Sequence, residues 1–356
     1  MRRQYCYLLL LLGLPVQAGE WFPVRTIVDG KTTEYIPLPH AAKPWRICAL
    51  LPHARDKYFW GVSWGLEEEA LRLGVSIGIY QAGGYEHLAE QRQQFAECLA
   101  LGADAIVLCA ISSAGLNSDI ERAAQRHVPV IDLVNGVSSN AVAARSLVSF
   151  ADMSFAAARY MLADAGNRHI KVLWLPGPQD AKWVRDAEVG LKQALQGHDV
   201  DVVQGGYAAT ESSSQMALIR HRLKPNEIDY VLGNAVSAEM ASNYLRYQAQ
   251  GGQHARIIAF YATEPVTALI HEGRVLAAPS DSAVLQARIA VDLAIRVLEG
   301  KPHGRQVAPY IEVLDHDNID RYDMSKLLAP LNQGFVQHAL KGEQNATQGQ
   351  LPSLTR

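Results

Sequence analysis

Hydrophobic residues along the chain form short, almost wholly apolar runs that alternate with longer amphipathic stretches. The runs typical of strands cover residues 45–51, 75–80, 105–110 and 128–133. The stretches with helical periodicity cover residues 57–73, 86–100 and 116–126. Strands that are apolar on both faces are typical of a sheet covered by helices on each side. This alternation, within about 90 residues, predicts a doubly wound parallel sheet with right-handed crossovers.

The same alternation restarts after residue 150. Helices are predicted at residues 151–165, 181–195, 215–223, 238–250, 265–271 and 283–298. Strands are predicted at residues 171–175, 200–203, 230–232, 257–260, 275–277 and 307–313. An internal echo links the halves: each has a strand that ends in Leu-Pro, at Leu51 and Leu175, before a helix with Gly-Leu in its middle, at Gly65 and Gly190. The pattern therefore predicts an α/β fold of two doubly wound parallel-sheet lobes joined by a hinge.

The N-terminus has the features of a cleaved secretory signal peptide over residues 1–18. Arg2 and Arg3 precede a short apolar run, and Ala18 ends a stretch of small residues of the kind that a signal peptidase reads. The run is far shorter than the roughly 20 apolar residues that span a bilayer. We therefore expect an exported mature protein that is not inserted in a membrane.

The remaining chain divides into an arm, two lobes and a tail. Residues 19–44 are expected to form a Pro-containing N-terminal arm, and residues 316–356 a C-terminal tail. The first lobe is predicted to contain residues 45–148 with about 280–300, and the second lobe residues 149–279 with about 301–315. A chain of 356 residues has the length for two such lobes.

Charge and composition exclude several classes of function. The 33 Lys and Arg and the 36 Asp and Glu residues are interspersed and leave a net charge of −3, which argues against a nucleic-acid binder. A hydrophobic content of 49% excludes a wholly disordered chain. We expect no nucleic-acid partner.

Three cysteines remain once the signal peptide is removed: Cys48, Cys98 and Cys109. An oxidising compartment permits one disulfide and leaves one thiol. Cys48 lies in the first predicted strand and Cys98 in a helix that could pack on it, which favours Cys48–Cys98 over a pairing with Cys109. Three buried free cysteines are the alternative.

The chain lacks the usual enzymatic motifs. Gly61–Gly65 matches G-x-S-x-G, but the preceding strand ends by Pro52 and the match lies inside a helical pattern, which argues against a serine hydrolase. There is no H-x-x-x-H or C-x-x-C spacing, and no glycine-rich phosphate loop follows a strand. We therefore expect a non-enzymatic protein without a metal or cofactor.

Aromatic and acidic residues gather in the loops that follow the predicted strands. Since two facing lobes form a cleft at these strand ends, Tyr58, Tyr85 and Tyr261 are expected in it. Asn135, Asn234 and Asp281 are further candidate contacts, with helix capping as the alternative for Asp281. Aromatic faces around an enclosed space favour a cationic ligand.

The chain resembles the periplasmic binding proteins of the ribose-binding type, and within them the periplasmic sensors of trimethylamine N-oxide respiration. The matching segments are Cys-Ala-Leu-Leu-Pro at 48–52, Asp56 with Tyr58, Ala-Gly-Gly-Tyr at 82–85, Leu-Val-Asn at 133–135, Leu-Pro-Gly-Pro at 175–178, Phe260-Tyr261 and Gly-Arg-Val at 273–275. They run in order along almost the whole mature chain, which makes the match fairly specific.

The resemblance implies a periplasmic sensor that binds trimethylamine N-oxide (TMAO) and regulates a membrane sensor histidine kinase. It implies an aromatic box with one polar partner, carried here by Asp56, Tyr58, Phe59, Tyr85, Phe150 and Tyr261. The family pattern has Trp at the positions of Phe59 and Phe150. These two differences predict either cation binding weaker by about 1 kcal/mol or more, or a different ligand. For Phe59, packing in its own helix is an alternative role. The alternative function is a sugar- or autoinducer-binding component of an ABC importer.

Overall fold

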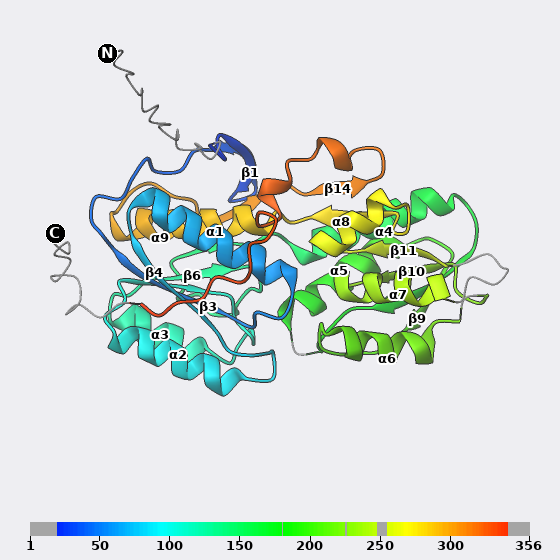
Figure 1. Cartoon of the computed structure of the whole chain (residues 1–356), viewed down its shortest axis with the longest axis horizontal. Coiled ribbons are helices and arrows are strands. Elements are labelled where there is room, and N and C mark those ends of the chain that lie inside the picture. The colour runs from blue at the N-terminus through cyan, green and yellow to red at the C-terminus, as the bar shows by residue number, and fades with distance from the viewer. Residues whose placement is uncertain (1–19, 180, 225, 248–254, 341–356) are drawn as a thin grey trace, which may run out of the picture.

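Two α/β lobes lie side by side along the long axis of the molecule (Figure 1). The computed structural model describes residues 20–179, 181–224, 226–247 and 255–340, so the expected signal peptide lies outside the described residues. Within those ranges, no helix has the length and apolarity needed to cross a membrane.

The first lobe is built on an eight-stranded sheet in the order β2-β1-β13-β7-β6-β5-β3-β4. Its parallel strands are β3 (Arg46–Leu51), β4 (Ser76–Gln81), β5 (Ala105–Leu108), β6 (Val130–Leu133), β7 (Ala144–Ser146) and β13 (Gln306–Pro309). Its helices are α1 (Lys57–Leu73), α2 (Leu88–Ala100), α3 (Asn117–Gln125) and α9 (Ala283–Leu298). In Figure 1, α1 and α9 cover one face of the sheet, and α2 and α3 cover the other. The strands are buried on both faces, as their apolar sequences predict.

The second lobe is built on a six-stranded sheet in the order β14-β12-β11-β10-β8-β9. Its strands are β8 (Ile170–Leu175), β9 (Val200–Gln204), β10 (Tyr230–Gly233), β11 (Arg256–Ala259) and β12 (Ala277–Ser280), all parallel, with the antiparallel β14 (Glu312–Asp315) at one edge. Its helices are α4 (Phe150–Ala165), α5 (Lys182–Leu195), α6 (Ser212–Arg222), α7 (Ala235–Tyr247) and α8 (Glu264–His271). Two doubly wound, largely parallel sheets confirm the predicted fold class.

The Gly-Leu echo has a structural reason in both lobes. A Cβ added at Gly65 of α1 would lie 2.5 Å from the carbonyl oxygen of Val284 in α9. A Cβ added at Gly190 of α5 would lie 1.9 Å from the carbonyl oxygen of Ala151 in α4. Both glycines allow two helices to pack with their backbones in close approach. The echo therefore marks the equivalent helix pair of each lobe.

Up to β14, the chain passes between the lobes at three places: from β7 to α4, from β12 to α9, and from β13 to β14. The last passage corrects the predicted single strand over residues 307–313. Gln306–Pro309 belongs to the first sheet, where it pairs with β7 and β1, whereas Glu312–Asp315 belongs to the second. The assignment of all of residues 301–315 to the second lobe is therefore wrong. A continuous β-type sequence carries no signal that the chain changes sheets within it.

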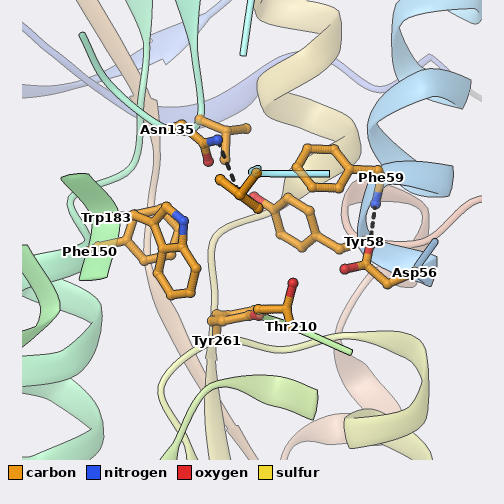
Figure 2. A pocket seen from close by; sticks show the side chains of 10 residues that line it. Asp56, Tyr58, Phe59, Asn135, Phe150, Trp183, Thr210 and Tyr261 are labelled. Carbon is orange, nitrogen blue, oxygen red and sulfur yellow. Dashed lines mark hydrogen bonds between the residues drawn. The ribbon is translucent and has the colours of Figure 1, made fainter. Parts of the chain in front are cut away.

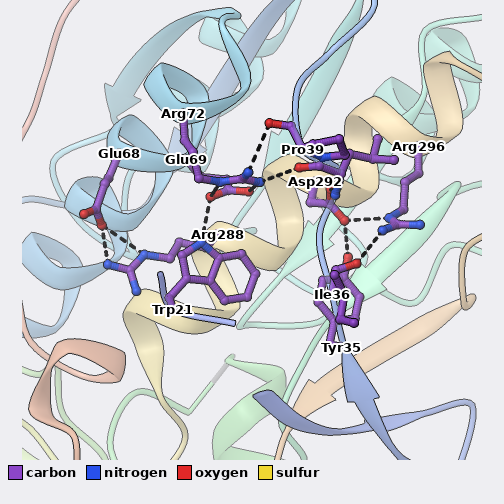
Figure 3. Close-up of polar contacts among 11 residues, drawn as sticks. Trp21, Tyr35, Ile36, Pro39, Glu68, Glu69, Arg72, Arg288, Asp292 and Arg296 are labelled. Carbon is purple, nitrogen blue, oxygen red and sulfur yellow. Dashed lines mark hydrogen bonds and ion pairs between the residues drawn. The ribbon is translucent and has the colours of Figure 1, made fainter. Parts of the chain in front are cut away.

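The N-terminal arm is part of the first lobe. Residues of the arm form a hairpin of β1 (Val24–Val28) and β2 (Lys31–Tyr35), and β1 pairs with β13. Figure 3 shows how polar contacts attach the arm to α1 and α9. The Tyr35 hydroxyl and the Leu38 backbone N–H donate to the Asp292 carboxylate, and the Trp21 indole donates to Glu69 at 2.9 Å. Sequence pattern misses this hairpin because its strand β2 is largely exposed and polar.

The described part of the C-terminal tail returns to the first lobe. His338 forms an antiparallel bridge with Ile79 of β4, and the Val336 N–H donates to Ser63 Oγ at 3.0 Å. Ser63 Oγ in turn donates to the carbonyl of Trp60 at 3.0 Å and is fully buried within α1. The G-x-S-x-G match is therefore a helix-packing segment and not a nucleophile elbow.

A disulfide joins the sheet of the first lobe to the helix that covers it. Cys48 of β3 and Cys98 of α2 are bonded, with their Cα atoms 6.1 Å apart. Cys109 is buried and free. The favoured pairing from the sequence is confirmed.

Candidate ligand-binding site

A cavity with about 310 Å³ of empty space, including its opening to solvent, lies between the two lobes. Figure 2 shows the side chains that line it. The six residues of the expected box are all among them: Asp56, Tyr58, Phe59, Tyr85, Phe150 and Tyr261. The other lining residues are Val134, Asn135, Trp183 and Thr210. We refer to this space as the interlobe cavity.

The side of the cavity formed by Asp56, Tyr58, Phe59, Tyr85, Val134 and Asn135 is the first-lobe wall. Asp56 is the N-cap of α1, where one carboxylate oxygen accepts from the Phe59 N–H at 3.1 Å. Because Asp56 caps α1, the helix begins just before Tyr58 and Phe59, whose rings line the cavity. Burial raises the pKa of Asp56, while the neighbouring His53 and the helix N–H groups lower it. Asp56 thus places one carboxyl group at a site otherwise made mostly of rings.

The Tyr58 hydroxyl points away from the ligand space and donates to the carboxylate of Asp281. Gln286 Nε2 donates to the same Asp281 oxygen at 3.0 Å. Burial raises the pKa of Asp281 to about 6, against the opposing bonds from Tyr58 and Gln286. Asp281 is a candidate contact from the sequence, but it does not line the cavity. It holds the Tyr58 ring in place instead.

Tyr85 and Asn135 form the second polar group of the first-lobe wall. Asn135 Nδ2 donates to the Tyr85 hydroxyl at 3.0 Å and to the carbonyl of Ala110 at 2.9 Å. Val134, directly before it, has a φ of 61°. A β-branched residue in this left-handed region carries strain of about 1–3 kcal/mol, a feature that clusters at functional sites. The strained backbone turns the Asn135 amide toward Tyr85.

The opposite side of the cavity is the second-lobe wall, formed by Phe150, Trp183, Thr210 and Tyr261. Phe150 begins α4, Trp183 lies in the first turn of α5, Thr210 precedes α6 and Tyr261 follows β11. The Phe150 and Trp183 ring centroids are 5.4 Å apart, and Tyr261 lies 6.2 Å and 6.0 Å from them. Tyr261 also lies 5.8 Å from Tyr58, so it joins the rings of the two walls.

Sequence reasoning misses three lining residues and includes two that do not line the cavity, Asp281 and Asn234. Val134, Trp183 and Thr210 are absent from the expected set. Asn234 is in that set, but its Nδ2 donates to the Leu175 carbonyl and its Oδ1 accepts from the Ser237 N–H at 3.0 Å, inside the second lobe. An Asn that follows a strand suits a helix start as well as a ligand contact, and here it begins α7.

The arrangement suits a small solute with a cationic centre. Six aromatic side chains surround the cavity, and Asp56 supplies its carboxylate. Ring faces attract a cation through their quadrupole, most strongly where water is excluded. Nothing in the described ranges groups three His, Cys, Asp or Glu side chains in a way that could hold a metal ion.

Comparison with known proteins identifies relatives over most of the chain. A model of the periplasmic binding protein domain matches residues 48–302. Periplasmic protein TorT of Escherichia coli strain K12 is 33% identical over 291 residues, which cover 82% of this chain and 83% of TorT.

Solved structures agree with these sequence matches. An ABC transporter solute-binding protein from Bradyrhizobium sp. BTAi1 with bound bis-tris has 40% sequence identity and a TM-score of 0.78, covering 90% of this chain and 99% of its own. TorT in complex with the TorS sensor domain in the presence of TMAO has 25% identity and a TM-score of 0.74, covering 83% of this chain and all of TorT in that structure.

Proposed function

The chain belongs to the periplasmic binding protein family and is periplasmic, and on this premise we propose that it is a sensor for a small methylated amine N-oxide such as TMAO. The ligand would bind in the interlobe cavity, and the ligand-bound form would regulate a membrane sensor histidine kinase. The observation that carries the proposal is the set of six aromatic side chains and one carboxylate around a single small cavity.

The chemistry of TMAO matches the two kinds of group that line the cavity. Its nitrogen bears a positive charge spread over three methyl groups, which suits the faces of Tyr58, Phe150 and Tyr261. The space of about 310 Å³ includes the opening to solvent, so the enclosed part of the cavity is smaller than that. A compact methylamine therefore fits better than a pyranose, which also needs many more hydrogen-bonding partners than this cavity offers.

The relatives support the same ligand class. A TorT protein has been crystallised with the TorS sensor domain in the presence of TMAO, and this chain is TorT-like in sequence and fold. The protein from Bradyrhizobium holds bis-tris, a buffer molecule that carries a tertiary amine and five hydroxyl groups. The TorT comparison favours an amine-type ligand over a sugar.

Ion pairs between the lobes help to couple ligand binding to the arrangement of the lobes that a kinase would sense. Arg55 of the first lobe forms an ion pair with Glu211 of the second, and Lys57 lies 3.3 Å from Glu264. Arg55 and Lys57 flank Asp56 in the sequence, and both ion pairs join the two lobes, so separation of the lobes would break them. A ligand that contacts both walls favours the closed arrangement, and a kinase that distinguishes closed from open senses the ligand.

Isothermal titration calorimetry with the mature protein tests the proposal. We expect saturable binding of TMAO, weaker binding of D-ribose or none, and loss of TMAO binding in Tyr85→Ala. Exposed Tyr247→Ala in the second lobe is the matched control and should bind like the wild type. The proposal fails if TMAO and related methylamines do not bind, or if Tyr85→Ala binds them unchanged.

A second candidate is delivery of an amine to an ABC importer. The observation that favours it is the 40% identity to a protein described as an ABC transporter solute-binding protein. Purified protein with and without TMAO should be passed over the immobilised periplasmic domain of a sensor kinase encoded beside it. Ligand-dependent retention supports the sensor, whereas ligand-dependent stimulation of a transporter ATPase in liposomes supports the importer.

A further inference from the structure

Trp183 brings to the interlobe cavity a buried indole N–H that forms no hydrogen bond of good geometry with the described residues, although the Tyr85 hydroxyl lies near it. Its side chain is 4% exposed, and its indole Nε1 is among the buried side-chain atoms without a hydrogen-bond partner. Buried N–H groups are almost always paired in native proteins, so an unpaired one at a ligand cavity requires an explanation. Figure 2 shows the indole nitrogen on the edge of the ring that faces the cavity.

The surrounding residues hold the ring in this orientation. Gly177 has a φ of 124°, and a Cβ added there would lie 2.6 Å from Cη2 of Trp183. The benzene edge of the indole therefore occupies the space above this glycine. Phe150 and Tyr261 pack against the same ring at 5.4 and 6.0 Å between centroids. Because the ring is packed on these sides, its N–H cannot turn to an acceptor in the protein core.

A second donor lies beside it. The Tyr85 hydroxyl accepts from Asn135 Nδ2 at 3.0 Å, which leaves its own O–H free to donate. Burial raises the pKa of Tyr85, while the Asn135 amide and the Trp183 indole N–H lower it, so the indole N–H is close enough to interact with that hydroxyl. Asp56 lies across the cavity from Trp183 in Figure 2. The cavity therefore has a negative side at Asp56 and a side with two donors.

We propose that Trp183 is a specificity-determining residue, whose Nε1–H binds the oxygen of an amine N-oxide together with the Tyr85 hydroxyl. The positive nitrogen and its methyl groups then face Asp56 and the rings. A ligand with a positive nitrogen and a negative oxygen pairs with Asp56 on one side of the cavity and with the two donors on the other. A methylated ammonium ion has no such oxygen and leaves the indole donor unpaired. The inference rests on the proposed function, since it assigns the part of that ligand which the second-lobe wall recognises.

The test compares TMAO with tetramethylammonium, which has a methyl group in place of the oxygen. Trp183→Phe keeps a ring and removes the donor. We expect it to weaken TMAO binding about ten-fold, corresponding to about 1.4 kcal/mol, and to change tetramethylammonium binding less than about two-fold. Trp174→Phe is the matched control, because the Trp174 Nε1 is also buried and unpartnered but lies in β8 outside the cavity lining.

The outcomes separate this inference from the proposed function. If Trp183→Phe weakens the binding of both ligands equally, or of neither ligand, the proposed role of the indole N–H is overturned, while the aromatic site remains supported. Failure of the wild type to bind either ligand overturns the proposed function itself. A readout that needs no variant is the indole ¹H–¹⁵N resonance of Trp183: TMAO should shift it downfield and tetramethylammonium should not. The same shift with both ligands contradicts the proposal.

Discussion

The two walls of the interlobe cavity differ in how their polar groups are satisfied. On the first-lobe wall, Asp56 caps α1, Tyr58 donates to Asp281, and Tyr85 accepts from Asn135. On the second-lobe wall, rings pack on one another and the Trp183 donor forms no hydrogen bond of good geometry with the described residues. We infer that the first-lobe wall is preformed, and that the second-lobe wall is completed by ligand when the lobes close.

The largest expected effect is on the stability of the lobe that carries the preformed wall. The Cys48–Cys98 disulfide closes a segment with a sequence separation of 50 residues. Removing it with Cys48→Ala/Cys98→Ala should lower the free energy of unfolding by about 3–4 kcal/mol. Chemical denaturation measures the change, and a reductant should destabilise the wild type but not the double variant. Equal stability of the two proteins would contradict the role of the disulfide.

Removing the ring that joins the two walls should have the next largest effect. Tyr261 contacts Tyr58, Phe150 and Trp183, and we expect Tyr261→Ala to weaken TMAO binding about 100-fold, or about 2.7 kcal/mol. Calorimetry measures this loss, and denaturation checks that the variant is folded. A folded Tyr261→Ala protein with wild-type affinity would show that the rings of the two walls do not act on one ligand.

The charge on the first-lobe wall can be tested separately from its geometry. Asp56→Asn keeps an N-cap of similar quality and removes the carboxylate, so we expect about ten-fold weaker binding of tetramethylammonium at pH 7. Unchanged affinity in this variant would exclude a role for the charge.

Protonation of Asp56 should make the affinity for tetramethylammonium depend on pH. Burial raises the pKa of Asp56, so the carboxylate becomes protonated at a higher pH than an exposed Asp. Affinity for tetramethylammonium, which does not titrate, should fall as the pH is lowered through this pKa. A bound cation lowers the pKa of Asp56 in the complex. The affinity for tetramethylammonium should therefore stop falling once the pH is below this lower pKa of the complex. Asp56→Asn should show no such decline, and a decline of equal size in the variant would assign it to another group.

The smallest expected effect concerns the ion pairs between the lobes. Arg55 and Glu211 are each about half exposed, with side chains 42% and 37% accessible. Exposed pairs contribute about 0.2–1 kcal/mol, so Arg55→Glu should weaken ligand binding by no more than about five-fold at low salt. The charge-swapped double variant Arg55→Glu/Glu211→Arg should recover part of the loss. Arg55 also lies 3.3 Å from Glu86, so recovery will be incomplete.

The two walls also differ in how far the sequence predicts them. Tyr58 and Tyr85 lie in the segments that follow the apolar strands β3 and β4. Because the carboxyl ends of parallel strands meet at one edge, their place at the cavity can be predicted. Trp60 and Trp183 each lie between the Leu-Pro and the Gly-Leu of the internal echo, yet the two residues have different roles. The Trp60 indole donates to the Ala54 carbonyl at 2.9 Å and does not line the cavity.

The lobe boundaries are also only partly predictable from the sequence. Apolar alternation predicts the two sheets, because burial on both faces requires it. Pattern alone does not show that Gln306–Pro309 and Glu312–Asp315 lie in different sheets, or that the hairpin of β1 and β2 extends the first one. Which sheet a strand joins depends on contacts between distant segments, such as those of Asp292 with Tyr35 and Leu38.

A crystal structure of the mature protein grown with TMAO tests the central claim most directly. The account predicts one TMAO molecule between the walls, its methyl groups against Tyr58 and Tyr261 and its oxygen within hydrogen-bond distance of Tyr85 and Trp183. An empty interlobe cavity at a saturating TMAO concentration, or a ligand bound elsewhere on the surface, would contradict it.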